Sequence, residues 1–550
     1  MLATVFFLDS RFRVLPDAIH NALPAHHPGL IITDITISQC SSLNLLSSCK
    51  LASTKWHRIE KDLYLSRGWV SHAYVHIARK REENLEEGEK IVYDVGVGRL
   101  SPGSSGAKGI NDWESRPGGI WLKRLAKRHA SDSDKAVTAV DVLFGADAVD
   151  PRSGWKILDQ QLSLSNIGDN PLPRISIRQG RAPKIEKPPL RVNKNGRFKI
   201  LQVADLHLST GLGVCRDAEP ASLHGEKKCE ADPRTLEFIS SVLDLEIPDL
   251  VVLSGDQVNG DTAPDAQTAI FKFAELFISR KIPFACIFGN HDDEGTMSRE
   301  DHMDLLNTLP YSLSEAGPSN LDGIGNYHLE ILGRGHSHHS AATLYLLDTH
   351  SYSPDERNFR GYDWLKKGQI DWFRATAQDL KRTPSHHEYS HIRMDMAFIH
   401  IPLPEYRNVE DISEKSGKAK EPPTAPGFNS GFKDALIEAG VLTVSCGHDH
   451  ANDYCAMARS AEGEIKGGEQ GKGHEPSLWM CYAGGSGLGG YGGYADSSKG
   501  YGRFVRRVRV YELDFNVARI DTWKRIEAGP AKDSRVDEMM LAEGGKVVPG

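Results

Sequence analysis

The pattern of apolar and polar positions changes near residue 181. Residues 31–179 hold short, β-branched stretches that partly alternate between apolar and polar side chains, with clusters of Gly, Pro and Ser between them. Clear examples are residues 32–37, 72–77 and 136–142. Because no long amphipathic helix interrupts these stretches, we expect an all-β domain over residues 31–180, preceded by an N-terminal segment, 1–30.

Beyond this region the pattern becomes that of an α/β protein. Pro183, Pro188 and Pro189 disfavour helix and central strand, so residues 181–196 are predicted to be a linker. Residues 197–525 then alternate apolar runs with helical spacing, which predicts a layered α/β domain followed by a C-terminal tail, 526–550. Helices are expected at 234–246 and 266–279, and strands at 198–204, 250–253, 283–288, 343–347, 395–399, 442–445 and 478–482.

Bulk properties restrict the class of protein only modestly. A length of 550 residues suggests two domains, and a net charge of -8 argues against a general nucleic-acid binder. The apolar start, Met1–Leu8, is much shorter than the ~20 residues that span a bilayer. We therefore expect a cytoplasmic protein without stable membrane insertion. The alternative is a membrane-anchored, vacuolar or secretory protein if a longer N-terminal anchor belongs to it.

Eight cysteines are too few for a disulfide scaffold. Cys40 and Cys49, and Cys215 and Cys229, lie close enough in sequence to pair, and free thiols are the alternative for each pair.

The most informative residues are polar side chains at the ends of apolar runs. Five short segments carry them: Asp205-Leu-His207, Gly-Asp256, Gly-Asn290-His291-Asp292, His400, and Gly-His448-Asp-His450. Ligands at the carboxyl ends of buried strands are where α/β proteins build active sites. Residues two apart in an extended segment point to the same side, so Asp205 with His207, and His448 with His450, suit shared ligation.

These residues form a mixed set of nitrogen and oxygen ligands without a thiolate. Such a set suits Mn, Fe or Zn and disfavours a structural zinc site. A carboxylate can bridge two ions, and Asp256 is the natural bridge. Two ions at ~3.5–4 Å polarise a phosphoryl group and generate a bridging hydroxide. The predicted ligands are Asp205, His207, Asp256, Asn290, His400, His448 and His450.

In this order the segments resemble the calcineurin-like metallophosphoesterase superfamily, over roughly residues 197–523. Residues 361–364, 400–405 and 447–453 further resemble the fungal dosage-dependent cell-cycle-regulator phosphatases and a plant branch named with the purple acid phosphatases. The N-terminal half resembles the fungal group only. The resemblance implies a four-layer αββα sandwich, two divalent or mixed-valence metal ions, and hydrolysis of phosphomonoesters, with phosphoproteins as the suggested substrates.

The resemblance also implies individual roles. One metal would be held by Asp205, His207, Asp256 and His450, and the other by Asp256, Asn290, His400 and His448. His291 would face the substrate, stabilise the transferring phosphoryl group and protonate the leaving oxygen, because His titrates near neutral pH. The metal-bridging hydroxide would attack phosphorus in line, without a covalent enzyme intermediate.

One position departs from the better-known relatives. Three residues after the bridging aspartate, purple acid phosphatases have a tyrosine that gives their colour, and Ser/Thr phosphatases have an aspartate that orients the catalytic histidine. This chain has Asn259 there. An amide can hydrogen-bond His291, and Asp292 is a second candidate for that role, with a backbone cap as its alternative.

The same residues are compatible with other functions. A phosphodiesterase or nucleotidase would use the same metal set, and a non-catalytic binding or scaffold protein is the rival from another class. Candidate rim residues of the site are Arg216, His350, Tyr352 and Tyr362. The His-Glu-X-X-His match at 387–391 lacks helical context, and the Gly-X-Gly-X-X-Gly match at 487–492 lacks a following helix. Partners are expected to be a phosphorylated protein or small phosphomonoester, not a nucleic acid.

Overall fold

The computed structural model describes most of the chain, and the apolar start and the 387–391 motif lie outside the described part. The described residues are 29–41, 49–65, 70–86, 88–98, 113–126, 134–165, 170–222, 228–382, 392–411, 415–459, 477–496, 500–528 and 534–549. The chain forms two compact units, residues 1–185 and 186–550. Within the described ranges, no helix is long and apolar enough to cross a membrane.

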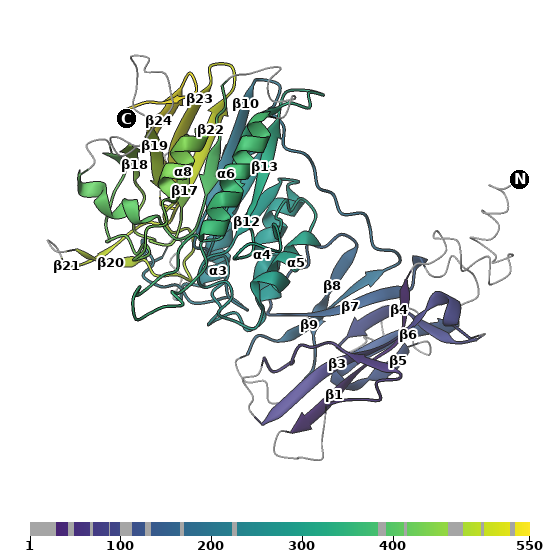
Figure 1. The fold of residues 1–550 in the computed structure, drawn as a ribbon. Helices are drawn as coiled ribbons and strands as arrows, with labels where there is room; N and C mark the ends of the chain where they lie inside the picture. The colour runs from purple at the N-terminus through teal and green to yellow at the C-terminus, as the bar shows by residue number, and fades with distance from the viewer. Residues whose placement is uncertain are drawn as a thin grey trace, which may run out of the picture. The chain divides into compact units, whose positions relative to one another are not determined.

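In its described residues, the N-terminal unit forms three antiparallel sheets of three strands each (Figure 1). In every sheet the third strand lies between the first and the second, which gives the orders β1-β3-β2, β4-β6-β5 and β7-β9-β8. The strands are β1 (Leu30–Ser41), β2 (Trp56–Arg58), β3 (Ser71–Arg81), β4 (Lys90–Val97), β5 (Trp113–Arg116), β6 (Ile120–Ala126), β7 (Val137–Phe144), β8 (Trp155–Gln161) and β9 (Pro173–Gln179). The expected all-β domain is confirmed.

This arrangement is a threefold internal repeat that the hydrophobic pattern alone did not reveal. Each second strand begins with a tryptophan, at Trp56, Trp113 and Trp155. Each first strand has a register irregularity and an aspartate whose Oδ1 accepts the next backbone N–H, at 2.9, 2.9 and 2.8 Å for Asp34, Asp94 and Asp141. The three sheets share one apolar core, to which Ile35, Val92 and Val142 contribute.

The C-terminal unit is built on two seven-stranded sheets. The first has the order β12 (Phe284–Ile287), β11 (Leu250–Ser254), β10 (Arg197–Val203), β22 (Arg507–Asp514), β23 (Arg519–Ile526), β24 (Arg535–Glu543) and β25 (Lys546–Val547). The second has the order β13 (Tyr327–Leu332), β14 (Ser340–Leu346), β15 (Met396–Phe398), β17 (Thr443–Cys446), β19 (Ser477–Tyr482), β18 (Cys455–Arg459) and β16 (Lys415–Ser416). A separate hairpin joins β20 (Gly493–Asp496) to β21 (Gly500–Arg503).

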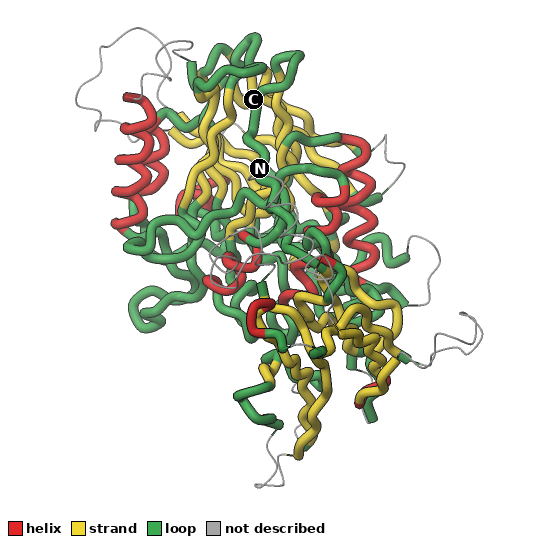
Figure 2. Tube along the Cα trace, turned by 90° about the vertical axis from the view of Figure 1, so that its right-hand side faces the viewer, coloured by secondary structure: helices red, strands yellow, loops and turns green. Residues whose placement is uncertain are grey.

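The two sheets pack face to face, and helices cover both outer faces (Figure 2). Phe273 and Phe277 of α4 pack on Phe284 of β12, while Phe373 of α6 meets Tyr345 of β14 edge to face at 4.8 Å. The helices are α3 (Ala231–Glu246), α4 (Ala266–Ser279), α5 (Arg299–Asn307), α6 (Lys367–Arg382) and α8 (Phe432–Ala439). The predicted four-layer αββα sandwich is therefore confirmed.

One expectation about the end of the chain was wrong. Residues 526–550 were expected to form a tail, yet β24 pairs antiparallel with β23, and β25 pairs with β24. These strands extend the first sheet, so the sandwich continues to the end of the described chain.

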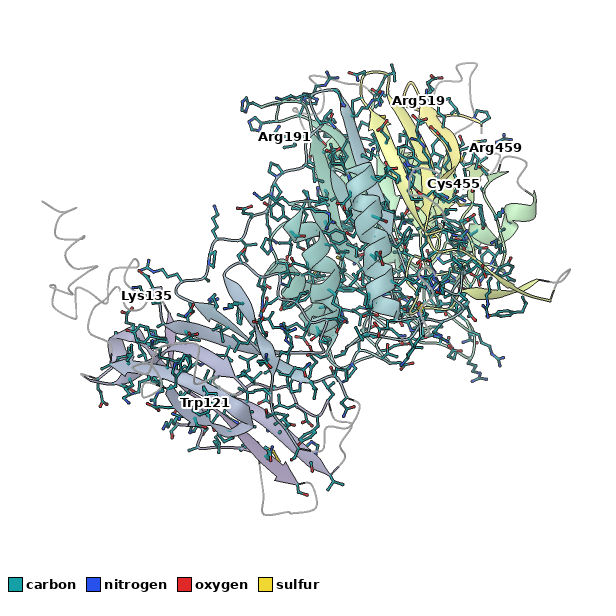
Figure 3. All side chains as sticks on the ribbon, turned by 180° about the vertical axis from the view of Figure 1, so that it is seen from behind. Trp121, Lys135, Arg191, Cys455, Arg459 and Arg519 are labelled. Atoms are coloured by element: carbon teal, nitrogen blue, oxygen red, sulfur yellow. A yellow bond between two sulfur atoms is a disulfide. The ribbon has the colours of Figure 1, made fainter. Side chains whose placement is uncertain are left out.

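The sheet topology explains where a site can form. Strands β10, β11 and β12 run parallel, and so do β14, β15 and β17. Their carboxyl ends therefore lie at one edge of the sandwich, where loops carry the predicted ligands. Arg191 and Arg519 lie at the other end of the sandwich (Figure 3). In the strand register, Arg519 of β23 is opposite Asp514 of β22, and Asp514 is opposite Arg197 at the start of β10.

Candidate metal centre

All seven predicted ligands lie together and buried at the carboxyl-end edge. Within each of three groups, the possible ligand atoms lie within 4.8 Å of one another. The groups are Asp205, His207 and His450; Asp256, His400 and His448; and His207, Asp256 and His291. The loops after β10, β11, β12, β15 and β17 supply them, in the order that the sequence predicts.

Asp256 lies between the two main groups. Its Oδ2 is 3.2 Å from Nε2 of His400 and 3.7 Å from Nε2 of His207. On one side, His207 and His450 bring their Nε2 atoms to 3.1 Å. On the other, Asn290 Oδ1 is 3.3 Å from His400 Nε2. This is the placement that a bridging carboxylate requires.

The residues fit divalent metal ions on two observations. Asp205 Oδ2 and His448 Nε2 are buried without a hydrogen-bond partner, which is costly for polar atoms unless a cation satisfies them. In addition, Nδ1 of His400 donates to the Ser254 carbonyl and Nδ1 of His450 donates to the Tyr491 carbonyl, both at 2.9 Å. Such bonds fix the tautomer in which Nε2 carries the free lone pair.

The electrostatics of the cluster determine which imidazoles are neutral and therefore able to bind a cation. Burial, reinforced by neighbouring positive groups, lowers the pKa of His207 to about 3, so this imidazole stays neutral. Burial also opposes a charge on His400, but Asp256 outweighs it and raises the pKa of His400 to about 9. A metal ion at this site would therefore displace a proton from His400.

The backbone is unusual at the same residues. Asp205, His207, Asp256 and His448 have positive φ angles of 57°, 48°, 54° and 77°. Non-glycine residues rarely occupy this left-handed region, and such strain gathers at functional sites. Gly255 has a φ of 95°, and a Cβ there would lie 2.2 Å from His400 Nδ1, which explains the Gly-Asp pair in the motif.

His291 is placed differently from the seven ligands. Its backbone N–H donates to Asp256 Oδ1 at 2.8 Å, and its side chain is 35% exposed. Its Nδ1 lies 2.5 Å from Oε2 of Glu294. Burial disfavours a charged ring, but Asp256 and Glu294 outweigh burial and raise the pKa of His291. The backbone of His291 is thus anchored to Asp256, while its ring is partly exposed and has the Glu294 carboxylate behind it.

The expected partners of His291 are corrected by this geometry. Asp292 is buried and accepts the backbone N–H groups of Asp256, Val258 and Gly289 at 2.9, 3.0 and 2.7 Å, so it is a backbone cap. Among the described residues, the side chains of Asn259 and Asp292 form no hydrogen bond with His291. Glu294 occupies that position instead, and only its spacing of three residues from His291 hinted at this.

Of the four candidate rim residues, three lie near the ligands and one supports the fold. Tyr352 and Tyr362 stack at the site, and Tyr362 meets His448 edge to face at 4.2 Å. Arg216 is exposed, and its charge helps to lower the pKa of His207. His350 instead pairs with Gln369 of α6 at 2.8 Å, so it supports the fold.

The loop that carries Glu421 and Thr424 is hydrogen-bonded to the His448–His450 turn. Glu421 accepts hydrogen bonds from the Ala451 N–H at 2.7 Å and from the Tyr491 hydroxyl at 2.9 Å. The Tyr491 ring lies flat on His450, with centroids 3.9 Å apart. Thr424 also binds Asp449 through its backbone N–H and hydroxyl. This loop therefore stabilises the His448–His450 turn through contacts with Asp449 and Ala451.

Glu421→Gln is expected to alter the pH dependence of stability. Burial raises the pKa of Glu421 from 4.5 to about 7, so in the folded protein it stays protonated while the unfolded chain ionises. The protonated Glu421 side chain therefore contributes its full stabilisation of the folded state below pH 4.5, and this contribution is lost as pH rises through 7. At pH 8 the neutral glutamine should unfold with a free energy higher by roughly 1–3 kcal/mol, and at pH 4.5 it should match the wild type.

Denaturant unfolding of the two proteins at both pH values, with chelator present, measures this difference. Asp434→Asn, a change on the exposed side of α8, is the matched control. An equal difference between the Glu421→Gln variant and the wild type at both pH values would contradict the assignment.

Three disulfides are present among the described residues. Of the two alternatives left open for each pair, the disulfide is formed in both, Cys40–Cys49 and Cys215–Cys229. A third, Cys455–Cys481, joins opposite residues of β18 and β19 and was not anticipated. Cys286 and Cys446 are buried free thiols.

The glycine-rich stretch at 487–492 packs against the ligand loops instead of opening a helix. A Cβ on Gly490 would lie 2.5 Å from His450 Cε1, so the backbone must approach the imidazole closely. This contact accounts for the motif without a dinucleotide.

Comparison with known proteins agrees with this geometry. Residues 198–452 match the family model described as calcineurin-like phosphoesterase. The chain is 36% identical over 420 residues to the phosphatase DCR2 of Saccharomyces cerevisiae, covering 72% of this chain and 65% of that protein. The chain thus spans just under two thirds of that relative's length.

Two further relatives match over most of their own length. An uncharacterized protein of Schizosaccharomyces pombe is 32% identical over 509 residues, covering 91% of this chain and 87% of that protein. A match of that extent must include part of the N-terminal unit. The protein of Arabidopsis thaliana named Probable inactive purple acid phosphatase 29 is 36% identical over 358 residues, covering 62% of this chain and 84% of that protein.

Proposed function

The chain belongs to the calcineurin-like phosphoesterase family, and from that premise we propose that it hydrolyses phosphomonoesters, with phosphoproteins as its substrates. One observation supports the proposal above all others: seven buried side chains that are candidate metal ligands meet the partly exposed His291 at one edge of the sandwich. The name of the Saccharomyces cerevisiae relative supports phosphatase activity.

We assign the following roles to the residues. Asp205, His207, Asp256 and His450 would hold one metal ion, and Asp256, Asn290, His400 and His448 would hold the other. When bound, two such ions polarise the phosphoryl group and activate water. His291 holds a proton beside the leaving oxygen, and Glu294 fixes the ring so that this proton points to the substrate.

The rival proposals differ in measurable ways. A diesterase or nucleotidase would turn over bis(4-nitrophenyl) phosphate or nucleotides better than simple monoesters. A binding protein would bind metal without turnover, which is the question raised by the word inactive in the name of the plant relative.

The test is metal analysis alongside a substrate panel. We expect the protein, loaded with Mn or with Fe and Zn, to hydrolyse a chromogenic phosphomonoester and phosphopeptides faster than diesters. We also expect no visible charge-transfer band, because Asn259 stands where purple acid phosphatases have tyrosine. Absence of turnover with every metal would support the hypothesis of a binding protein. A purple preparation would contradict the interpretation of Asn259.

The three disulfides also bear on the compartment. Disulfides persist in oxidising compartments and are rare in the cytosol. We therefore propose that the protein folds in a disulfide-forming compartment, contrary to the cytoplasmic location first expected. Mass spectrometry of the alkylated native protein tests this, because thiol-modified Cys455 and Cys481 would contradict it.

A further inference from the structure

Two stacked tyrosines line the rim of the metal centre. Tyr352 and Tyr362 face each other across an antiparallel bridge, with ring centroids 5.5 Å apart and planes inclined by 23°. Tyr362 is anchored by its edge-to-face contact with His448. Tyr352 is 49% exposed, so the pair presents a flat aromatic surface to solvent.

Backbone hydrogen bonds within the hairpin flank this pair on both sides. Ser353 N–H donates to the Gly361 carbonyl at 2.8 Å, and Asp363 N–H donates to the Ser351 carbonyl at 3.0 Å. The Asp363 carboxylate in turn pairs with Lys366. A surface fixed in this way can bind a ring with little loss of conformational entropy.

The pair is connected through Glu294 to His291, the proposed proton donor to the leaving oxygen. The Tyr352 hydroxyl donates to Glu294 Oε1 at 3.0 Å, and Glu294 Oε2 lies 2.5 Å from Nδ1 of His291. Two hydrogen bonds therefore separate the exposed ring from the imidazole. A group attached to an oxygen beside His291 could therefore meet the exposed Tyr352 ring at the rim of the site.

We propose that Tyr352, backed by Tyr362, is a subsite for a flat aromatic leaving group, so that aryl phosphomonoesters such as phosphotyrosine are preferred over alkyl ones. This inference rests on the proposed function. In the reaction the bond from phosphorus to the aryl oxygen breaks and the oxygen of water forms the new bond to phosphorus. His291 supplies a proton to the departing oxygen, and the proton released by the water replaces it on His291. Offset stacking of the leaving ring on Tyr352 favours this substrate class.

Variants at Tyr352 separate the ring from the hydroxyl. Aryl esters are intrinsically more reactive, so the informative quantity is the ratio of kcat/KM for a phosphotyrosine peptide to that for the same peptide with phosphoserine. Tyr352→Leu removes the ring and should lower this ratio about tenfold. Tyr352→Phe keeps the ring and should leave the ratio within twofold of the wild type. Tyr501→Leu, at another exposed tyrosine, is the control.

A binding measurement keeps this inference distinct from the proposed function. We expect the metal-loaded protein to bind benzylphosphonate about tenfold more tightly than ethylphosphonate in calorimetry, and Tyr352→Leu to remove that difference. Equal affinity of the wild type for the two phosphonates, or an unchanged ratio in Tyr352→Leu, would overturn the aromatic subsite. Selective binding without turnover would support the subsite while refuting phosphatase activity.

Discussion

Asp256→Asn is expected to remove the metal ions and to lower kcat/KM for a phosphomonoester by more than about 10³-fold. Asp256 is the carboxylate between the two groups, close to both His400 and His207. The amide keeps the size of the side chain and can still accept the His291 N–H, but it loses the negative charge that would hold two cations. Elemental analysis after gel filtration, together with the steady-state rate, measures both effects.

Asp292→Asn is the matched control, because Asp292 is equally buried but only caps backbone N–H groups. We expect that variant to retain metal and to unfold at a lower temperature, since a charged acceptor is lost. If Asp256→Asn kept both metals, the bridging assignment would be wrong.

His291→Asn is expected to lower kcat by about 10²–10⁴-fold while leaving metal content unchanged, because the residue supplies a proton and not a ligand. Glu294→Gln should lower kcat about tenfold, since a neutral amide still bonds Nδ1 but no longer favours the charged imidazole. Rate measurements from pH 5 to 9 should show the basic limb of the Glu294→Gln profile shifted to lower pH.

Glu300→Gln, on the exposed first turn of α5, is the control for this pair. Loss of metal in His291→Asn would make His291 a ligand. An unchanged pH profile in Glu294→Gln would reduce Glu294 to a surface contact.

The sequence pattern located most of the parallel strands but missed the antiparallel part of the first sheet. Helix α4 was predicted at its observed bounds, 266–279. Strand β22 was missed because Arg507 and Arg509 lie at buried positions and conceal its hydrophobic signal. Their partners are Asp453, the Tyr482 carbonyl and Thr522, which only the tertiary fold brings close.

Within the site, the residues that could be predicted were those that follow the ends of strands. Asp205, Asp256 and His400 follow buried strands directly, so their convergence could be expected from the alternation of elements. The partner of His291 depends instead on how one turn folds. Because Asp292 turns inward to cap three N–H groups, Glu294 is left to face the ring, and no periodicity in the sequence encodes that choice.

The left-handed backbone at Asp205, His207, Asp256 and His448 has a consequence for descent within the family. Asp, Asn and His are among the few residues apart from Gly that tolerate this conformation. Conformation and ligation thus select the same small set of residue types. A relative that lost its catalysis would still be restricted by its fold to Asp, Asn, His or Gly at these positions, so part of the ligand motif should persist after the activity is lost.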